Sequence, residues 1–269
     1  MKKKNFLIPI NKTKKNVINF FKSKNIYEVL KNQNNHKRPI NQMVWSKTLA
    51  PDLNDLYRLY QFVYLNKRTT ILEIGTGWST FVLAHALQAV KNDNYETFNQ
   101  LKLRRHNPFE IFTLDNSKKY LNISKKRILK LNKNKIAKVS YCHSDIFVDL
   151  YMGKFVSNYK NLPLCNPDFI YIDGPDPFMV KGKINNFNPG HGDLMPINAD
   201  ILKIEYYLIP GTIILLDGRT SNARFLRDHF KRKWIYKHDK KNDQNIFYLD
   251  EPPLGKVNQK QLMFYSSNN

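Results

Sequence analysis

Apolar residues along this chain follow two spacings, one typical of strands and one typical of helices. Short apolar runs predict strands over 69–74, 110–115, 137–142, 168–173 and 211–217, with a last pair over 233–238 and 244–249. Between them, apolar residues recur at helical spacing over 79–90, 118–131, 197–208 and 221–230. A further helical pattern starts after Asp52, which is a typical N-cap residue. Strands and helices therefore alternate from residue 51 onward.

This alternation predicts an α/β fold of the Rossmann-like, doubly wound type, with a mostly parallel seven-stranded sheet and helices on both faces. The last two strands are joined by a short polar turn over 239–243, so we expect a C-terminal antiparallel hairpin. Residues 91–107 are expected to loop out before the second strand. Residues 1–50 are rich in Lys and Asn and predict a basic N-terminal extension of weak helices and loop, followed by one domain over 51–269.

Composition supports a folded protein and leaves the meaning of its charge open. The chain has 269 residues with 17 Phe, 15 Tyr and 3 Trp, which is far more aromatic than a disordered segment. Its formal charge is +22, from 44 Lys and Arg against 22 Asp and Glu, which ordinarily suggests nucleic acid, an anionic membrane face or an acidic substrate. A genome with low GC content would produce the same excess of Lys, and the lysines are spread along the whole chain. A solvated surface and an anion-facing role both remain open.

The cysteines and the lengths of the apolar runs indicate the cellular compartment. Cys142 and Cys165 stand in no metal-like spacing and fit a reducing compartment without disulfides. The apolar residues after the basic start are too few for a signal peptide, and the longest apolar run, 206–216, is interrupted by Pro210-Gly211. We therefore expect no membrane span and a cytoplasmic protein.

The first strand ends in Glu73-Ile-Gly75-Thr-Gly77-Trp-Ser79. In an open parallel sheet this strand-to-helix turn is where glycine lets the backbone approach a nucleotide. Ser79 stands at the third small position, and Glu73 lies inside the motif, which departs from the dinucleotide fingerprint. Asp115 ends the second strand, where a carboxylate can accept both hydroxyl hydrogens of a ribose. Asp145 follows the third strand, where it could hold an adenine amino group.

Together with Ser144-Asp145 and Ile172-Asp173-Gly174, these motifs resemble the class I S-adenosylmethionine-dependent methyltransferases, especially the small-molecule O-methyltransferases of the catechol methyltransferase type. The resemblance covers roughly residues 50–250 and implies a seven-strand order with a terminal hairpin and S-adenosyl-L-methionine as cofactor. It also implies that Gly75 and Gly77 face the methionine portion, Asp115 the ribose and Asp145 the adenine.

Candidates for chemistry follow the fourth and fifth strands. If these strands are neighbours, Asp173 and Asp217 end about 5 Å apart at the backbone, close enough to share a hard divalent cation such as Mg²⁺. In the metal-dependent catechol-type family, an Asn follows the second acid and a Lys lies shortly after the first. This chain has Gly218 and Asp176 at those places, so strand-end carboxylates that act without a metal remain an alternative. Arg219 and Asn222 follow Asp217 and are further candidates, with an anionic substrate group or a structural ion pair as the two interpretations of Arg219.

A long polar segment after the fourth strand, residues 179–200, is typical of a functional loop. Within it, glycines flank His191 on both sides, and His191 and Asp193 are candidates for a general base and its orienting acid, or for additional metal ligands. An ordinary surface histidine is the alternative.

The function predicted from these residues is methylation of a small-molecule or carbohydrate hydroxyl, with Asp173, His191 and Asp217 as catalytic candidates. The charge suggests RNA or DNA methylation as a competitor, but the corresponding site reads Asp173-Gly-Pro-Asp176 and lacks the amino-methylating signature. Neither cysteine stands in a Pro-Cys pair. A non-catalytic or NAD-binding Rossmann-like protein is the remaining alternative, and no pattern indicates the oligomeric state.

Overall fold

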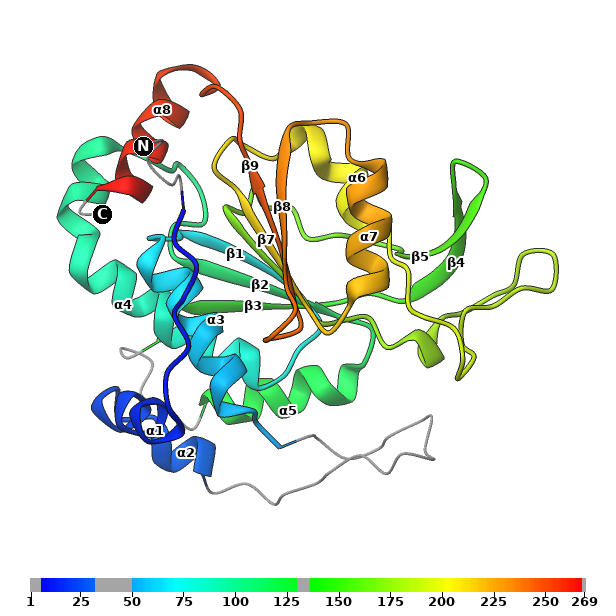
Figure 1. The fold of residues 1–269 in the computed structure, drawn as a ribbon, viewed down its shortest axis with the longest axis horizontal. Helices are drawn as coiled ribbons and strands as arrows, with labels where there is room; N and C mark the ends of the chain where they lie inside the picture. Colours follow the sequence, from blue (N-terminus) through cyan, green and yellow to red (C-terminus); the bar gives the residue numbers. More distant parts are fainter. Residues whose placement is uncertain (1–5, 32–49, 130–135, 268–269) are drawn as a thin grey trace.

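A seven-stranded sheet forms the centre of the protein (Figure 1). The computed structural model describes residues 6–31, 50–129 and 136–267. The sheet order is β3-β2-β1-β6-β7-β9-β8. Its strands are β1 (Thr70–Ile74), β2 (Glu110–Asp115), β3 (Lys138–His143), β6 (Phe169–Ile172), β7 (Ile213–Asp217), β8 (Trp234–Asp239) and β9 (Gln244–Leu249).

Strand directions confirm the predicted Rossmann-like fold. The neighbours from β3 through β7 pair in parallel, whereas β9 runs antiparallel to both β7 and β8. Counted along the chain within this sheet, the order is 3-2-1-4-5-7-6. The chain moves outward from β1 in one direction and then returns to add β6 on the other side of β1. This reversal makes a topological switch point at the carboxyl ends of β1 and β6, where ligands bind in such sheets.

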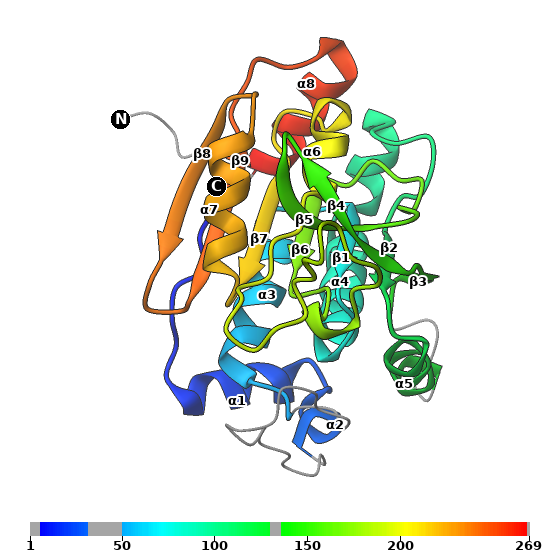
Figure 2. The same cartoon turned by 90° about the vertical axis from the view of Figure 1, so that its right-hand side faces the viewer.

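Successive side chains of each strand pack alternately into two separate hydrophobic cores, because they point to opposite faces of the sheet. Ile71 packs into the core shared with α1, α3, α4 and α8, and Leu72 into the core shared with α6 and α7. Figure 2 shows the sheet between these helices. The helices are α1 (Lys14–Ser23), α2 (Tyr27–Lys31), α3 (Leu53–Leu65), α4 (Trp78–Leu101), α5 (Lys118–Leu129), α6 (Asp200–Ile204), α7 (Thr220–His229) and α8 (Gly255–Ser266).

The N-terminal residues are packed against this domain. An N-terminal strap, residues 6–13, runs along α3 into α1 (Figure 1). Leu7 and Asn66 exchange hydrogen bonds of 2.7 and 2.9 Å, and Phe6 stacks on Tyr248. Buried apolar residues of α1 and α2 then join the core next to α3. Residues 6–31 thus share a core with the sheet, while the remainder of the predicted extension, 1–5 and 32–49, lies outside the described residues.

A second, two-stranded sheet interrupts the alternation. Strands β4 (Ile146–Tyr151) and β5 (Lys154–Tyr159) form an antiparallel hairpin whose two-residue turn has φ of +48° at Met152 and +75° at Gly153. Two positive φ values define the type I′ turn that favours tight hairpins. Backbone bridges tie β4 to Lys181 and β5 to Asn198, so the hairpin is attached to the long loop that follows β6.

Three helical expectations need correction. Residues 91–101 do not loop out, because α4 continues to Leu101 and its Phe98 packs against Phe109 and Phe264; only 102–107 of the predicted 91–107 form a loop. The predicted helix over 197–208 is reduced to α6 and the 3-10 helix η3 (Glu205–Tyr207), and α8 was not predicted. The last two residues of the predicted helix 118–131 lie outside the described residues. Among the described helices, none has the length and apolar character to cross a bilayer.

Candidate functional site

The candidate residues lie along one edge of the sheet. Strand β1 pairs with β2 on one side and β6 on the other, and β6 pairs with β7. All four strands are parallel, so their carboxyl ends meet at the same edge. That edge brings together the glycine turn after β1, Asp115 at the end of β2, Asp173 after β6 and Asp217 at the end of β7.

Gly75 must be glycine because of the protein around it. Its φ is +94°, a left-handed value that favours glycine. A Cβ built on Gly75 would lie 2.6 Å from the Gly174 backbone nitrogen, and a Cβ on Gly174 would lie 2.6 Å from the Gly75 Cα. The Ile74 carbonyl accepts hydrogen bonds from the amides of Asp173 and Gly174 at 2.9 and 2.8 Å. The two glycines therefore let the turns after β1 and β6 touch.

Gly77 is under no such constraint. Its φ of −173° lies outside the left-handed region that favours glycine. A Cβ at this position would meet only Ser79 Oγ, at 3.6 Å, which is ordinary contact. The protein itself thus leaves free space beside Gly77, and an absent side chain here keeps the backbone open to a ligand.

Buried Glu73 holds the turn from beneath. Thr80 donates a 2.7 Å hydrogen bond to Glu73 Oε2, and the Gly77 amide donates to the same Thr80 hydroxyl at 3.2 Å. Burial raises the pKa of Glu73 to about 7, with the nearby Ser79, Thr80 and Thr113 hydroxyls opposing the rise. Glu73 Oε1 has no hydrogen-bond partner among the described residues. Glu73 therefore positions the Gly77 amide through Thr80.

Arg127 of α5 fixes the outer side of the same turn. Its guanidinium donates a 3.1 Å hydrogen bond to the Gly77 carbonyl and lies 3.3 Å from the centre of the Trp78 ring. Burial lowers the pKa of Arg127 to about 10. Sequence analysis did not single out Arg127 and missed this contact. The one available signal was the arginine, which stacks on aromatic rings more readily than lysine does.

Asp115 is oriented by backbone amides. Thr76 donates to Asp115 Oδ2 at 2.9 Å, and Ser117 donates to Oδ1 at 2.6 Å. Burial raises the pKa of Asp115, and these two amides oppose the rise. Each carboxylate oxygen has a second lone pair, so Asp115 retains acceptor capacity for two hydroxyl groups.

Asp145 lies just beyond β3 and is engaged by the long loop. Lys181 forms a 2.8 Å ion pair with Asp145 Oδ1, and the hydrogen bond from this lysine lowers the pKa of the carboxyl. The Lys160 amide donates to the Asp145 carbonyl. In this structure the Asp145 carboxylate, which is expected to hold the adenine amino group, is thus paired with Lys181.

Asp173 and Asp217 form an acidic pair on neighbouring strand ends. Tyr171 donates a 3.1 Å hydrogen bond to Asp217 Oδ2. Desolvation by the surrounding protein raises the pKa of each acid to about 6. The Arg219 charge opposes the rise at Asp173, whereas the Asp173 charge adds to the rise at Asp217. The Asp173 side chain nevertheless reaches solvent. A carboxyl with a raised pKa that is still accessible to solvent can exchange protons with a bound ligand.

Asp55 joins this acidic edge from the first turn of α3. Burial raises the pKa of Asp55 to about 7, and the charge of Asp217 adds to the rise. Asp52 caps the same helix as predicted, accepting from the amides of Asn54 and Asp55. Sequence reasoning missed Asp55 because nothing in the pattern showed which sheet edge α3 approaches.

The other candidates after β6 and β7 have structural partners. Arg219 Nη2 donates to the backbone carbonyls of Asp173 and Pro175 at 2.7 and 3.0 Å, so it holds the turn after β6. Asp176 accepts from the Phe178 amide at the start of the 3-10 helix η2 (Pro177–Met179). Asn222 is buried and exchanges hydrogen bonds with the Asn198 backbone.

His191 lies on the exposed surface of the long loop. Its Nδ1 accepts from the Asp193 amide at 3.2 Å and lies 3.8 Å from Asp193 Oδ2. The loop is anchored nearby by Asn188, which donates to the carbonyls of Val180 and Gly182. Across the ranges that the structure describes, no three His, Cys, Asp or Glu side chains converge to hold a metal ion, so His191 is not grouped there with Asp173 and Asp217.

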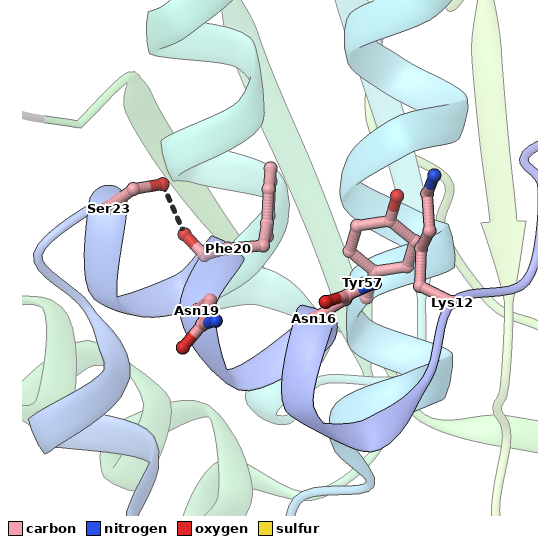
Figure 3. Close-up of a pocket in the computed structure, with 6 residues that line it drawn as sticks. All are labelled: Lys12, Asn16, Asn19, Phe20, Ser23 and Tyr57. Atoms are coloured by element: carbon pink, nitrogen blue, oxygen red, sulfur yellow. Dashed lines mark hydrogen bonds between the residues drawn. The ribbon is translucent and has the colours of Figure 1, made fainter.

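A recess between two helices is lined by other residues. It has a volume of about 370 Å³ between α1 and α3 (Figure 3). Its lining residues are Lys12, Asn16, Asn19, Phe20, Ser23 and Tyr57. None of the acids or glycines of the sheet edge contributes to it.

Comparison with known proteins adds likeness of fold only. No family model and no curated protein matches this sequence. Among solved structures, the chain is similar to a Bacillus cereus O-methyltransferase in complex with SAH, at 17% identity and a TM-score of 0.37, covering 91% of this chain and 93% of that one. It is also similar to the SAH-bound Podospora anserina methyltransferase PaMTH1, at 13% identity and a TM-score of 0.43, covering 91% and 100%. Such likeness is too low to assign an activity.

Proposed function

We propose that this protein is an S-adenosylmethionine-dependent methyltransferase that acts on a hydroxyl group of a small molecule or carbohydrate. The observation that carries the proposal is Gly77, a glycine that the protein's own packing does not require, on a turn held by Glu73 and Arg127 beside Asp115. A turn built around open backbone at the switch point of a parallel sheet is suited to a nucleotide-like ligand.

Each part of the cofactor has a candidate partner. The methionine portion would lie against Gly75, Gly77 and Ser79, and the ribose hydroxyls would donate to the free lone pairs of Asp115. The adenine amino group would take Asp145, in competition with Lys181. These assignments follow the resemblance, and the orientation of Asp115 by two amides supports the one for the ribose.

S-adenosylmethionine supplies an electrophilic methyl group on a sulfonium centre. The protein must then hold the acceptor oxygen in line and take its proton as the new carbon–oxygen bond forms and the carbon–sulfur bond breaks. Asp217 is the proposed base, because its pKa of about 6 makes it an anion at neutral pH that still accepts a proton more readily than an ordinary aspartate. Tyr171 orients its carboxylate.

Asp173 and Asp217 also fit a magnesium ion. Mg²⁺ is held in many proteins by one or two carboxylates, with water and substrate oxygens completing its shell, so the pair suffices without a third protein ligand. A bound cation would neutralise the acidic edge and favour an ionised acceptor oxygen. The exposed His191 is proposed as a further base contributed by the long loop.

Methyl transfer from labelled S-adenosylmethionine to a panel of catechols, phenols and sugars, with and without Mg²⁺, tests the proposal. We expect product with at least one acceptor, and a fall of about 10²-fold or more in kcat for Asp217→Asn. Asp228→Asn is the matched control, because Asp228 is exposed and, within the described residues, pairs with Arg227. Binding of NAD in place of S-adenosylmethionine would contradict the assignment.

A further inference from the structure

The β4–β5 hairpin and the neighbouring loop extend together from the body of the protein (Figures 1 and 2). The rings of Phe155 on β5 and Phe187 on the loop stack with centroids 4.5 Å apart, and Leu150 pairs with Phe155 across the hairpin. We call this surface the hairpin patch. It comprises Leu150, Met152, Lys154, Phe155, Lys183 and Phe187.

Three apolar members of the hairpin patch are exposed, and Phe187 is half-buried. Exposed fractions are 65% for Met152, 47% for Leu150 and 36% for Phe155. Met152 also occupies the first turn position with φ +48°, where Asn, Asp or Gly is favoured over an unbranched apolar residue. Contiguous exposed apolar residues of this kind mark interaction surfaces in soluble proteins.

The charge around the patch indicates the kind of partner. Residues 150–155 and 181–188 contain Lys154, Lys181 and Lys183 and no acidic residue, within a chain of formal charge +22. Lys181 is paired with Asp145, whereas Lys154 and Lys183 are exposed. Lys154 lies opposite Tyr151, on the other face of the hairpin from Leu150 and Phe155, so lysines flank the tip rather than share one face with its apolar residues. Aliphatic side chains at a projecting tip, flanked by lysines, are suited to an anionic lipid surface, where apolar groups enter the interface and lysines meet head groups.

Other partners fit less well. In a two-fold contact between copies of this chain, the same patch would face itself and would bring Lys154 and Lys183 of both copies together, which is unfavourable. Single-stranded nucleic acid is bound by rings whose faces are open to the bases, whereas Phe155 and Phe187 stack on each other and the tip carries Met152 and Leu150. We propose that the hairpin patch binds the surface of an anionic membrane. This proposal does not depend on the methyl-transfer reaction.

Sedimentation with lipid vesicles tests the proposal. The full chain is expected to bind vesicles of phosphatidylcholine mixed with phosphatidylglycerol and to bind phosphatidylcholine alone much more weakly. The double variant Leu150→Ser/Met152→Ser should lower the partition coefficient about tenfold. The double variant Lys154→Ala/Lys183→Ala should lower it about fivefold for each lysine removed.

Helix α8 provides matched controls at another end of the molecule (Figure 1). Val257 and Met263 have exposed fractions of 54% and 64%, close to those of Leu150 and Met152, and Lys256 and Lys260 are exposed on the same helix. Val257→Ser/Met263→Ser and Lys256→Ala/Lys260→Ala should leave vesicle binding nearly unchanged. Thermal melting of all four variants checks that each remains folded.

Three results would overturn the assignment. The first is absence of binding to the anionic vesicles, and the second is an equal loss in the α8 controls, which would mean that the basic surface as a whole is responsible. The third is a wild-type dimer in sedimentation equilibrium that Leu150→Ser/Met152→Ser converts to a monomer. That result would make the hairpin patch an interface between copies of the chain.

Discussion

At the scale of single residues, Gly75 and Gly77 are glycines for different physical reasons. Gly75 meets the Gly174 backbone and has a positive φ, so any side chain there disturbs the sheet edge. Gly77 has ordinary φ and room for a methyl group within the protein. The sequence motif predicted both as cofactor residues but could not separate them, because that distinction depends on the turn after β6.

Alanine substitutions at the two glycines should therefore have different effects. Gly77→Ala should leave the free energy of unfolding within about 0.5 kcal/mol of wild type, since surface changes without lost contacts are small. It should nevertheless weaken S-adenosylmethionine binding at least tenfold. Gly75→Ala should lower the free energy of unfolding by about 3 kcal/mol through strain and backbone contact. Denaturant unfolding and calorimetry measure the two effects, and normal cofactor binding by Gly77→Ala would contradict the role given to that turn.

The acidic pair of Asp173 and Asp217 should lower the free energy of unfolding at neutral pH. A carboxyl whose pKa is raised on folding favours the folded state at acidic pH, and this contribution is lost as pH rises toward the folded pKa, about 6 for Asp217. Asp217→Asn removes a half-buried charge and its repulsion with Asp173. We expect the variant to be more stable than wild type by about 1–2 kcal/mol at pH 7 without added metal, although it loses activity.

Thermal melting across pH measures this effect. The gain in Tm should shrink as the pH falls below about 6, because the wild-type carboxyls then become protonated. Asp228→Asn, at an exposed pair on α7, should show no such dependence. Destabilisation by Asp217→Asn at pH 7 would show that the Tyr171 hydrogen bond outweighs the repulsion.

At the scale of elements, the strands were more predictable than the helices. Apolar runs such as Ile213–Asp217 are buried on both faces, so their signal is continuous. Most of α4 beyond residue 90 is polar, and its one deeply buried anchor, Phe98, packs on residues distant in sequence. The β4–β5 hairpin was missed because its turn, Met152-Gly153, is not a typical turn sequence.

Arg58 of α3 is the residue that joins the N-terminal strap to the sheet. It donates to the Pro9 carbonyl, to Asn11 Oδ1 and to Gln244 Oε1, and pairs with Asp239 at 2.7 Å. The Arg58 side chain is buried, so Arg58→Ala should lower the free energy of unfolding by about 3–5 kcal/mol. Arg227→Ala removes an exposed pair with Asp228 and should cost less than about 1 kcal/mol. Similar losses for both variants, measured by urea unfolding, would contradict this account of the strap.

At the scale of the whole molecule, the two edges of the sheet carry acids with opposite properties. The carboxyl edge holds Asp173 and Asp217, whose pKa values are raised. The amino edge holds fully buried Asp168, which accepts from Thr69, Thr70 and Tyr265 and pairs with Arg104 at 3.2 Å. The acids at the strand ends were visible in the sequence. Only the structure distinguishes Asp168, whose carboxylate is occupied by hydrogen bonds and an ion pair, from Asp173 and Asp217, whose carboxylates can still bind a ligand.

Asp168 should be a determinant of stability rather than of activity. Burial alone would raise its pKa, but Arg104, Arg68 and several hydrogen bonds hold the pKa below the ordinary value of 3.8. Its stabilising contribution is therefore complete above about pH 4 and is lost as the pH falls through the lower, folded pKa. Asp168→Asn should cost about 3–5 kcal/mol at pH 7, and the difference from wild type should narrow in acid. A variant as stable as wild type at pH 7 would refute this role.

Calorimetric titration with S-adenosylmethionine tests the central claim most directly. Wild type should bind with micromolar affinity. Asp115→Ala should lose that binding, because Thr76 and Ser117 hold the Asp115 carboxylate at the place where we propose that the ribose binds. Added Mg²⁺ should change the heat of binding if Asp173 and Asp217 hold the ion. Failure of wild type to bind S-adenosylmethionine, or equal binding by Asp115→Ala, would contradict the account of this site.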